Sequence, residues 1–339
     1  MKNHLNQVFR VWTLGLTLCL AGASFAQTTN FPSKALKIVV PNAAGGAADI
    51  TARTVAQKLS EALGQSVVTE NKPSAGGIVA GEQVARSEPD GHTMLLISSG
   101  TAVSASLFKT LPFDTVKDFI PVSKLATFDL VIAVAEGGRF KTFAELMAYG
   151  KANPGKLNIG SINVGSTQHL AAELLRSQAN WVAQVVPYNG TPAVINALRG
   201  GQVDAAVEIL GPMKPQINAK AVRLLGVMGE SRPKDFPQTQ TVRELPGLSN
   251  FNVSSWNALA APAKTPKAVV ERLSQEVAKI LAQPEMVQRL AGFNVHPAGH
   301  SVAVDARHLK TGESVQVGIR PEHIPLGSEG AGTGVTASL

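Results

Sequence analysis

Residues 36–63 decide the fold, and they read LKIVVPNAAGGAADITARTVAQKLSEAL. The first five residues are an apolar run that stops at Pro41, which predicts a buried strand. A glycine-rich turn follows, and Asp49 is a good candidate for a helix N-cap. Apolar side chains then recur on one face of a helix that Gly64 ends. A strand, a glycine-rich turn and an amphipathic helix in this order predict an α/β sheet.

The same order of strand, loop and helix recurs along the chain in two groups. Further strands are predicted at 67–70, 93–97, 131–134, 157–160, 185–188, 203–208 and 222–228. Helices are predicted at 78–87, 143–151 and 168–179, and others begin near Thr191 and Thr265. Strands joined by helices pair in parallel and carry helices on both faces. The two groups therefore predict two α/β domains with mainly parallel sheets.

Four loops follow predicted strands, at the edge where open parallel sheets bind their ligands. They are small, polar or glycine-rich, and most of them lead into a helix N-terminus, whose free N–H groups attract anions. Serine and threonine hydroxyls can add hydrogen-bond donors. The loops are residues 41–49, 98–101, 161–169 and 188–192. We therefore expect these loops to contact a small carboxylate or phosphate.

The composition favours a small anion over nucleic acid as the ligand. The 339 residues include 31 Lys and Arg against 24 Asp and Glu, a formal charge of +7. Without Lys2 and Arg10, which lie in a segment that we expect to be removed, the charge is 29 − 24 = +5, too diluted to indicate nucleic acid. Aromatic residues make up only 5%, too few for stacking platforms. A single cysteine excludes a disulfide framework and a Cys-based zinc site.

The sequence has none of the common catalytic or phosphate-binding motifs. No G-x-G-x-x-G follows the first strand, and the patterns G-x-x-x-x-G-K-[ST], G-x-S-x-G and H-E-x-x-H do not occur. His169 and Glu173 are four residues apart and could share a metal ion, but no third ligand is in view. We therefore predict no catalytic residue, no cofactor and no metal. An envelope α/β enzyme acting on a small acid remains the alternative.

Residues 1–26 have the pattern of a secretory signal peptide. A basic start with Lys2 and Arg10 precedes an apolar run at 11–22, and small residues precede a cut after Ala26. A membrane anchor is the alternative, but twelve apolar residues span only about 18 Å of a bilayer core of roughly 30 Å. Cys19 would leave with the signal, and no later stretch is long and apolar enough to cross a membrane. We expect an exported, periplasmic protein.

A series of motifs resembles the tripartite tricarboxylate transporter substrate-binding proteins, also called the Bug family. They occur in the family's order, and the resemblance covers about residues 31–299. The motifs are PNAAGGAAD at 41–49 with Ala52-Arg53, ENKP at 70–73, SEPDGHT at 87–93, GSTQHLA at 165–171, VPYNGTPA at 186–193, GGQVD at 200–204 and SWN at 255–257.

The resemblance implies a two-domain clamshell of the periplasmic binding-protein type. The first domain would comprise 31–128 and 254–299, the second 129–253, and two chain crossings would form the hinge. Such a protein captures a small carboxylate between its domains and delivers it to the permease subunits of a tripartite tricarboxylate transporter. It makes and breaks no bond, binds no nucleic acid, and is expected to act as a monomer.

The resemblance also implies which residues bind the carboxylate. The family often has a hydroxyl residue where Ala47 or Ala48 stands, so the ligand preference of this chain is expected to differ. In the first domain the residues are Asn42, Ala43, Gly46, Ala47, Ala48, Asp49, Ser98, Ser99 and Thr101. In the second they are Ser161, Gly165, Ser166, Thr167, His169, Tyr188, Asn189 and Asp204.

The last forty residues depart from this family. Residues 311–324 read TGESVQVGIRPEHI and resemble the small β-domain, of the TOBE type, that ends ABC-importer ATPases. Family members normally continue with a helical segment that packs on the first domain, whereas 300–339 shows no sustained helical stripe. We expect an atypical tail here, without fixed structure from about residue 325. An inactive chimeric receptor is therefore a further alternative.

Overall fold

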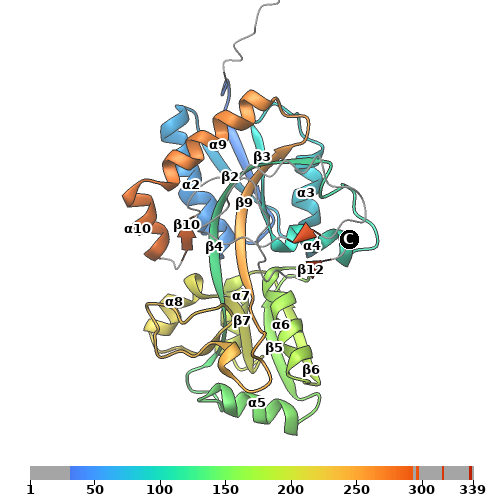
Figure 1. Cartoon of the computed structure of the whole chain (residues 1–339), viewed down its shortest axis with the longest axis vertical. Coiled ribbons are helices and arrows are strands. Elements are labelled where there is room, and N and C mark those ends of the chain that lie inside the picture. Colours follow the sequence, from blue (N-terminus) through green and yellow to red (C-terminus); the bar gives the residue numbers. More distant parts are fainter. Residues whose placement is uncertain (1–30, 293–294, 298–314, 317–335, 338–339) are drawn as a thin grey trace, which may run out of the picture. The chain divides into compact units, whose positions relative to one another are not determined.

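The computed structural model describes residues 31–292, 295–297, 315–316 and 336–337 (Figure 1). The chain divides into two compact units, 1–33 and 34–339, and every described helix and strand belongs to the second unit. The expected signal peptide, with its cut after Ala26, lies outside the described residues. None of the helices in the described part of the chain is long and apolar enough to cross a membrane.

The first lobe is a sheet built around the strand that begins the chain's first motif. Strand β1 (Leu36–Val40) pairs in parallel with β2 (Val67–Asn71) and β3 (Thr93–Ser98), and β3 pairs antiparallel with β9 (Ser254–Pro262). Its helices are α2 (Ala47–Leu63), α3 (Ile78–Ala85), α4 (Ser99–Leu107), α9 (Lys267–Leu281) and α10 (Pro284–Gly292). Helices α2 and α9 lie on one side of this sheet and α3 on the other (Figure 1).

The second lobe repeats the arrangement of strands and helices. Strand β5 (Leu157–Ile162) pairs in parallel with β6 (Ala183–Tyr188) and β7 (Ala205–Ile209). Its remaining elements are α5 (Phe143–Ala152), α6 (Thr167–Gln178), α7 (Thr191–Arg199), α8 (Leu210–Asn218) and β8 (Val222–Val227). The helix-connected strands of both lobes thus pair in parallel, as predicted.

One long strand, β4 (Phe119–Ala135), belongs to both lobes. Up to Asp129 it pairs antiparallel with β9, and from Leu130 onwards it pairs antiparallel with β7. Strand β10 (Val295–Pro297) pairs with β4 in the first lobe, and β8 pairs with it in the second. The order β2-β1-β3-β9-β4-β7-β5-β6 therefore runs through both lobes without a break. Periodicity predicted only the second-lobe end of β4, because its first-lobe part lacks a continuous apolar run.

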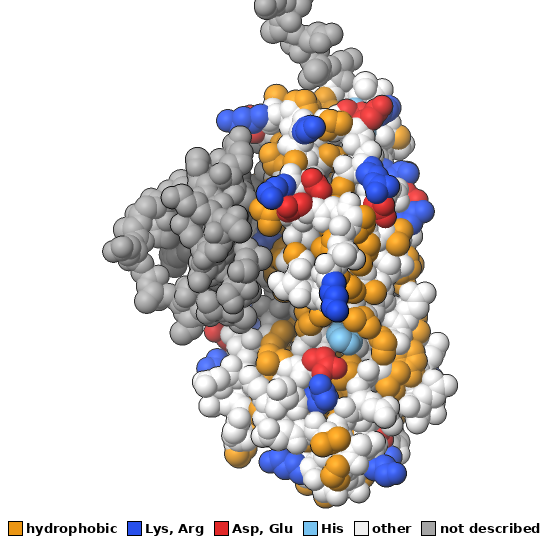
Figure 2. Space-filling model, turned by 90° about the vertical axis from the view of Figure 1, so that its right-hand side faces the viewer, with side chains coloured by type: hydrophobic (Ala, Val, Ile, Leu, Met, Phe, Trp, Pro, Cys, Tyr) orange, Lys and Arg blue, Asp and Glu red, His pale blue; other side chains and the backbone are white. Residues whose placement is uncertain are grey.

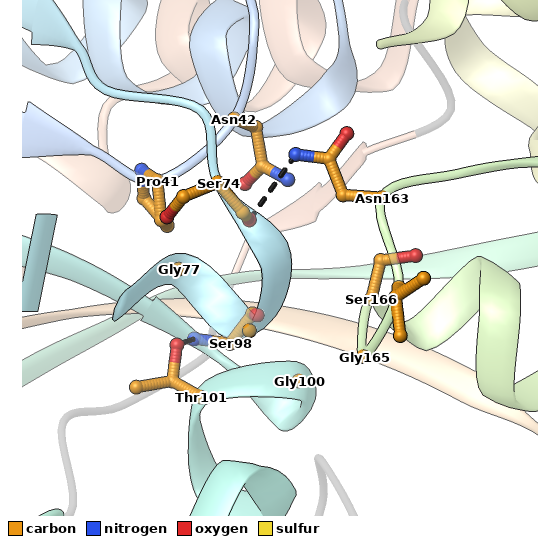
Figure 3. A pocket seen from close by; sticks show the side chains of 12 residues that line it. Pro41, Asn42, Ser74, Gly77, Ser98, Gly100, Thr101, Asn163, Gly165 and Ser166 are labelled. Atoms are coloured by element: carbon orange, nitrogen blue, oxygen red, sulfur yellow. Dashed lines mark hydrogen bonds between the residues drawn. The ribbon is translucent and has the colours of Figure 1, made fainter. Parts of the chain in front are cut away.

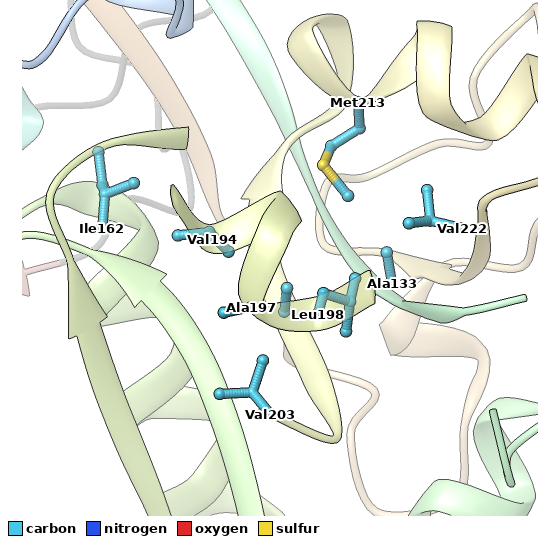
Figure 4. Packing of buried hydrophobic residues seen from close by; sticks show 9 residues of the cluster. Ala133, Ile162, Val194, Ala197, Leu198, Val203, Met213 and Val222 are labelled. Atoms are coloured by element: carbon cyan, nitrogen blue, oxygen red, sulfur yellow. The ribbon is translucent and has the colours of Figure 1, made fainter. Parts of the chain in front are cut away.

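Each lobe has its own hydrophobic core. In the first lobe, Val39 and Leu95 of the sheet pack with Ala80 and Val84 of α3 and with Phe119. The core of the second lobe packs α7 against β4, β5 and β7, and Figure 4 shows its buried residues Ala133, Ile162, Val194, Ala197, Leu198, Val203, Met213 and Val222. Two separate cores allow the lobes to keep their internal packing while their relative position changes.

Helix α2 begins three residues earlier than the sequence predicted. Its N-cap is Gly46, so Asp49 lies in the first turn instead of capping the helix. The Asp49 carboxylate nevertheless supports this helix end, because it accepts a hydrogen bond from the Gly45 N–H at 3.0 Å. An aspartate in the first turn also interacts favourably with the positive end of the helix dipole.

The structure describes only two short pieces of the atypical tail. These are β11 (Val315–Gln316) and β12 (Thr336–Ala337), which pair with each other antiparallel. The remainder of 300–339 lies outside the described residues, and so does most of the segment expected to lack fixed structure.

Truncation of a core leucine tests the packing of the second lobe. Leu198 is fully buried in the core on α7, so Leu198→Ala should lower the free energy of unfolding by about 2–5 kcal/mol in urea titrations. Leu174 on α6 is 38% exposed, and Leu174→Ala should change it by less than about 0.5 kcal/mol. Equal effects of the two substitutions would contradict this assignment of the core.

Candidate functional site

Two adjoining cavities lie where the loops of the two lobes meet. One encloses about 270 Å³ and the other about 460 Å³, and both volumes include space open to solvent. Asn42, Ser98 and Ser166 line both cavities, so the two form one cleft. In Figure 3, Asn163 and Ser166 of the second lobe face Asn42, Ser98 and other residues of the first lobe.

Helix N-termini surround this cleft. The first residues of α2 and α7, Ala47 and Thr191, line the larger cavity, and so does Thr167 at the start of α6. Helix α4 begins directly after the lining residue Ser98. The N–H groups of a first helical turn have no partners within the helix, and the helix dipole adds positive potential there. The cleft therefore suits an anion.

No lysine or arginine is among the described residues that line either cavity. On the face shown in Figure 2, basic side chains are spread singly, and several stand beside acidic ones. Arg176 pairs with Glu173 at 2.7 Å and Lys214 with Asp235 at 2.6 Å. The donors that the described lining offers to an anion are therefore backbone N–H groups and polar side chains, not cationic side chains.

Among the described residues, four hydrogen bonds connect the two lobes beside the cavities. Ser99 Oγ lies 2.8 Å from Thr167 Oγ1, and Ser255 Oγ donates to the same Thr167 oxygen at 3.1 Å. Gly76 N donates to the carbonyl of Val164 at 2.9 Å, and Asn163 Nδ2 donates to the Ser74 carbonyl at 3.2 Å. The lobes are therefore in direct contact, which is the closed arrangement of the cleft.

Residues without bulky side chains permit this contact. A Cβ atom on Gly100 of the first lobe would lie 2.6 Å from the carbonyl oxygen of Gly165 in the second. Gly190 has φ of +90°, and a Cβ atom there would lie 2.6 Å from Cβ of Ala43. Real Cβ atoms do not approach so closely, so a side chain at Gly100 or Gly190 would hold the lobes apart.

Ten of the predicted site residues line the cleft. They come from the first three of the four predicted loops, and they are Asn42, Ala43, Gly46, Ala47, Ala48, Ser98, Thr101, Gly165, Ser166 and Thr167. The hydroxyl of Ser166 is occupied structurally, since it accepts from His169 N at 3.1 Å and donates to the Ile162 carbonyl at 3.2 Å. Thr101 Oγ1 accepts from Ser98 N at 3.2 Å, so its own proton is free to be donated.

Asp49 supports the first loop from behind. Besides Gly45 N, its carboxylate accepts hydrogen bonds from Arg53 Nε at 3.0 Å and from Asn71 Nδ2 at 2.9 Å. Asn71 Nδ2 also donates to the Asn42 carbonyl at 2.9 Å. Burial alone would raise the pKa of Asp49, but these hydrogen bonds outweigh it and hold the pKa below its ordinary value. Asp49 therefore fixes the loop through its charge and does not line the cleft.

Six further predicted residues also lie outside the cavity linings. Ser99 takes part in the contact between the lobes, His169 follows Ser166 on α6, and Ser161 is buried and donates to a backbone carbonyl. Tyr188 packs on the second core and Asn189 is exposed.

Asp204 lies at the opposite end of β7 from the cleft. It precedes this strand, whereas Ile209 at the other end lines the larger cavity. Five residues of strand span about 17 Å. The Asp204 carboxylate accepts hydrogen bonds from Arg139 at 2.8 Å and from Asn158 N at 2.9 Å. Asp204 therefore stabilises the second lobe away from the cleft.

A second set of cleft residues was not among the predicted site residues, although eight of these fourteen lie in the four predicted loops. In the larger cavity they are Ile162, Gln168, Gly190, Thr191, Ile209, Ser255 and Asn257. In the smaller cavity they are Pro41, Ser74, Gly76, Gly77, Gly100, Asn163 and Val164. Many of these residues stand directly beside a predicted one. Residues 255 and 257, however, reach the cleft because β9 pairs with β4 between the lobes, which no local pattern indicated.

Glu208 is the strongest titratable feature near the cleft, and the motifs did not reveal it. It is fully buried, next to the lining residue Ile209. Burial raises the pKa of Glu208 to about 7, although hydrogen bonds from Gln168, Ile209 N and Thr191 lower it in part. His169 on α6 has its pKa lowered by burial, and Glu173 opposes this shift. Within the described residues, no group of three His, Cys, Asp or Glu side chains could hold a metal ion.

A mixed α/β sheet in two lobes, with an anion-binding cleft between them, defines the class of the periplasmic binding proteins. Within this class the two domains form a clamshell, and the predicted fold class is confirmed. Residues 51–315 match the family model described as "Tripartite tricarboxylate transporter family receptor", and the chain belongs to this family. The family consists of periplasmic solute-binding receptors and is not an enzyme family. The match extends past residue 299, into the segment that was expected to depart from the family.

Relatives and solved structures agree with this membership. A UPF0065 protein from the tcbD-tcbE intergenic region of Pseudomonas sp. strain P51 is 36% identical over 307 residues, covering 88% of this chain and 91% of the relative. Rpa4515 of R. palustris with adipate superposes with a TM-score of 0.77 at 29% identity, covering 80% of this chain and 91% of that one. MatC from Rhodopseudomonas palustris with bound malate has a TM-score of 0.75 at 30% identity, with coverages of 79% and 91%.

The buried carboxyl group of Glu208 predicts a pH dependence of stability. Its pKa of about 7 in the folded protein exceeds that of an exposed glutamate, about 4.5. Between these values the folded state binds more protons, so this contribution to stability is full below about pH 4.5 and is lost as the pH rises through about 7. Relative to Glu208→Gln, the free energy of unfolding of the wild type should fall by up to roughly 3 kcal/mol over this window. Urea titrations at several pH values measure this difference, and a constant difference would contradict the assignment.

Proposed function

We propose that this chain binds a small carboxylate in the cleft between its lobes and delivers it to the permease subunits of a tripartite tricarboxylate transporter. The observation that carries this proposal is the convergence of helix N-termini on a cleft with no lysine or arginine among its described lining residues. Backbone N–H groups there suit a carboxylate, and the relatives Rpa4515 and MatC contain adipate and malate.

We infer that the ligand is held mainly by backbone N–H groups of the first turns of α2, α6 and α7. Ser98 and Thr101 of the first lobe add hydroxyl donors. Asn257 is buried and lines the larger cavity, but it adds no free donor, because its Nδ2 donates to the Trp256 carbonyl at 3.1 Å. Its Oδ1 has no hydrogen-bond partner among the described residues, so it can accept from a hydroxyl or a protonated group of the ligand. The Ser166 and Thr167 hydroxyls already bond within the protein, so these two residues contribute chiefly through position.

We propose that the domains are 31–128 with 254–299 and 129–253, and that the hinge lies where β4 and β9 cross between them. The pairing of Asp129 with Ser254, followed by the change of partner at Leu130, supports these boundaries. Binding energy then shifts the equilibrium from open to closed lobes, and no bond is made or broken.

We also propose that residues 1–26 direct export to the periplasm and that the mature chain acts as a monomer. Membership of a family of periplasmic receptors supports the location. The likeness of 311–324 to the ATPase β-domain remains a hypothesis about the tail, and no ATPase activity is proposed.

Ligand binding is tested by thermal unfolding of residues 27–339 with acetate, succinate, adipate, malate and citrate, each at about neutral pH. An acid at 100 times its dissociation constant should stabilise the protein by about 2.7 kcal/mol and raise the midpoint by several degrees. Recovery of the unchanged acid from the complex distinguishes a receptor from an enzyme. A cooperative transition that none of these acids shifts would contradict the proposed ligand class.

Closure of the lobes is tested at Gly100. Gly100→Ala should weaken binding of the acid found above by about tenfold or more, since its Cβ atom would meet the Gly165 carbonyl only in the closed arrangement. Alanine favours helix α4, so the fold itself should be unharmed. Gly137→Ala is the matched control, because a Cβ atom there has nothing within 4 Å. Isothermal titration measures both, and equal affinities of the two variants would oppose closure at this contact.

A further inference from the structure

Glu208 places a buried acid directly behind the wall of an anion-binding cleft. It is the fourth residue of β7, opposite Val131 of β4, and its side chain is fully buried. Two of its hydrogen-bond donors, Thr191 and Gln168, themselves line the larger cavity. Only one side chain therefore separates the Glu208 carboxyl group from the space where a ligand carboxylate would lie.

All three donors bond the same oxygen of Glu208. Gln168 Nε2, Thr191 Oγ1 and Ile209 N donate to Oε2 at 3.3, 3.2 and 3.1 Å. The other oxygen, Oε1, is buried and has no hydrogen-bond partner among the described residues. An oxygen that accepts three hydrogen bonds has no room for a proton, so a proton on this carboxyl group resides on Oε1. The surroundings of Glu208 can thus accommodate its carboxyl group both as a carboxylate and as a neutral acid.

No described cation forms an ion pair with Glu208. The elements that pack against β7 are β4, β5, α6, α7 and α8. The titratable or charged groups on these elements, together with those near the start of α2, are Lys124, Asp129, His169, Glu173, Arg176, Arg199, Lys214, Asp49 and Arg53. Arg176, Lys214 and Arg53 have acidic partners of their own, and Arg199 is exposed. An ionised Glu208 is therefore balanced only by its three hydrogen bonds and by the helix N-termini around it.

A ligand carboxylate would compete with Glu208 for these same N-termini. Thr191 opens α7 and Gln168 lies in the first turn of α6, and both side chains are shared between Glu208 and the cavity. Two carboxylates that share one positive region repel each other, and the buried one then takes up a proton. The ligand, which must keep its charge to bind the N–H groups, remains ionised.

We propose that Glu208 couples ligand binding to protonation by taking up one proton on Oε1 when a carboxylate binds beside Thr191 and Gln168, so that the receptor binds its acid together with a proton. This inference rests on the proposed function, and it adds that the receptor favours carboxylates under mildly acidic conditions. Glu208 acts here as a positioning residue, since it reaches the ligand through the two side chains that it orients.

Calorimetric titration of three proteins tests the proposal. The proteins are the wild type, Glu208→Gln and Glu276→Gln, and the probe is whichever of acetate, succinate, adipate, malate and citrate binds the wild type. Glutamine at position 208 can accept the same three hydrogen bonds on its Oε1, and its side chain does not titrate. Glu276 is a matched control, because it is a buried glutamate on α9 that pairs with Arg272 and Lys279 and lines neither cavity. Titrations run from about pH 6.5 to 8.5, above the lowered pKa of His169, so that His169 is neutral in the empty protein.

The wild type and Glu276→Gln should lose affinity as the pH rises, by up to about tenfold per pH unit above the pKa of Glu208. In two buffers of different ionisation enthalpy, both should take up as much as one proton per ligand. Glu208→Gln should bind with an affinity that does not change with pH, and without proton uptake. A pH profile of Glu208→Gln equal to that of the wild type overturns the proposal while leaving the receptor function intact. Failure of every acid to bind the wild type at any pH overturns both.

Discussion

The pairing of β4 with β9 is the constraint on which the cleft depends. These strands run antiparallel from Phe119 opposite Pro262 to Asp129 opposite Ser254, and β4 then continues into the second sheet. The carboxyl ends of β1 and β3 in one lobe and of β5 and β6 in the other lead into loops at the cleft. Because the single strand β4 belongs to the sheets of both lobes, it keeps the loops of the two lobes close to each other.

The loops meet through close backbone approach at glycines and through a few short polar side chains. Gly100 and Gly190 remove the side chains that would prevent contact, and only a few polar side chains, such as Thr167 and Asn163, hydrogen-bond across the seam. Such a surface presents helix N-termini directly to the ligand. Backbone N–H groups do not titrate in this pH range and do not change rotamer as side chains do. A cleft of this kind can therefore suit carboxylates of different shape, provided that they fit its volume.

A buried acid in the wall of an anion site opposes the attraction that the site provides. Glu208 uses the same donors that face the cavity, and burial already favours its neutral form. The repulsion between Glu208 and a ligand carboxylate disappears once the Glu208 carboxyl group carries a proton. The energetics of the cleft thus depend on the balance between helix N-termini and one carboxyl group, whereas ion pairs between exposed side chains contribute little.

Local patterns in the sequence determined the lobes and much of the cleft. The strand, glycine-rich turn and helix at 36–63 were predictable because apolar periodicity, glycine and helix-capping residues act over a few neighbouring positions. Ten of the predicted site residues line the cavities for the same reason, since they stand in the loops that follow parallel strands.

The tertiary structure alone decided which distant residues join those loops. Ser255 and Asn257 reach the cleft through the pairing of β9 with β4, and Glu208 becomes a buried acid only because β4, α6, α7 and α8 surround β7. Asp204 stands four positions earlier and precedes the same strand, at its far end from the cleft. Strand direction, pairing partner and burial arise from contacts between segments far apart in the chain, and a single sequence does not encode them as local patterns.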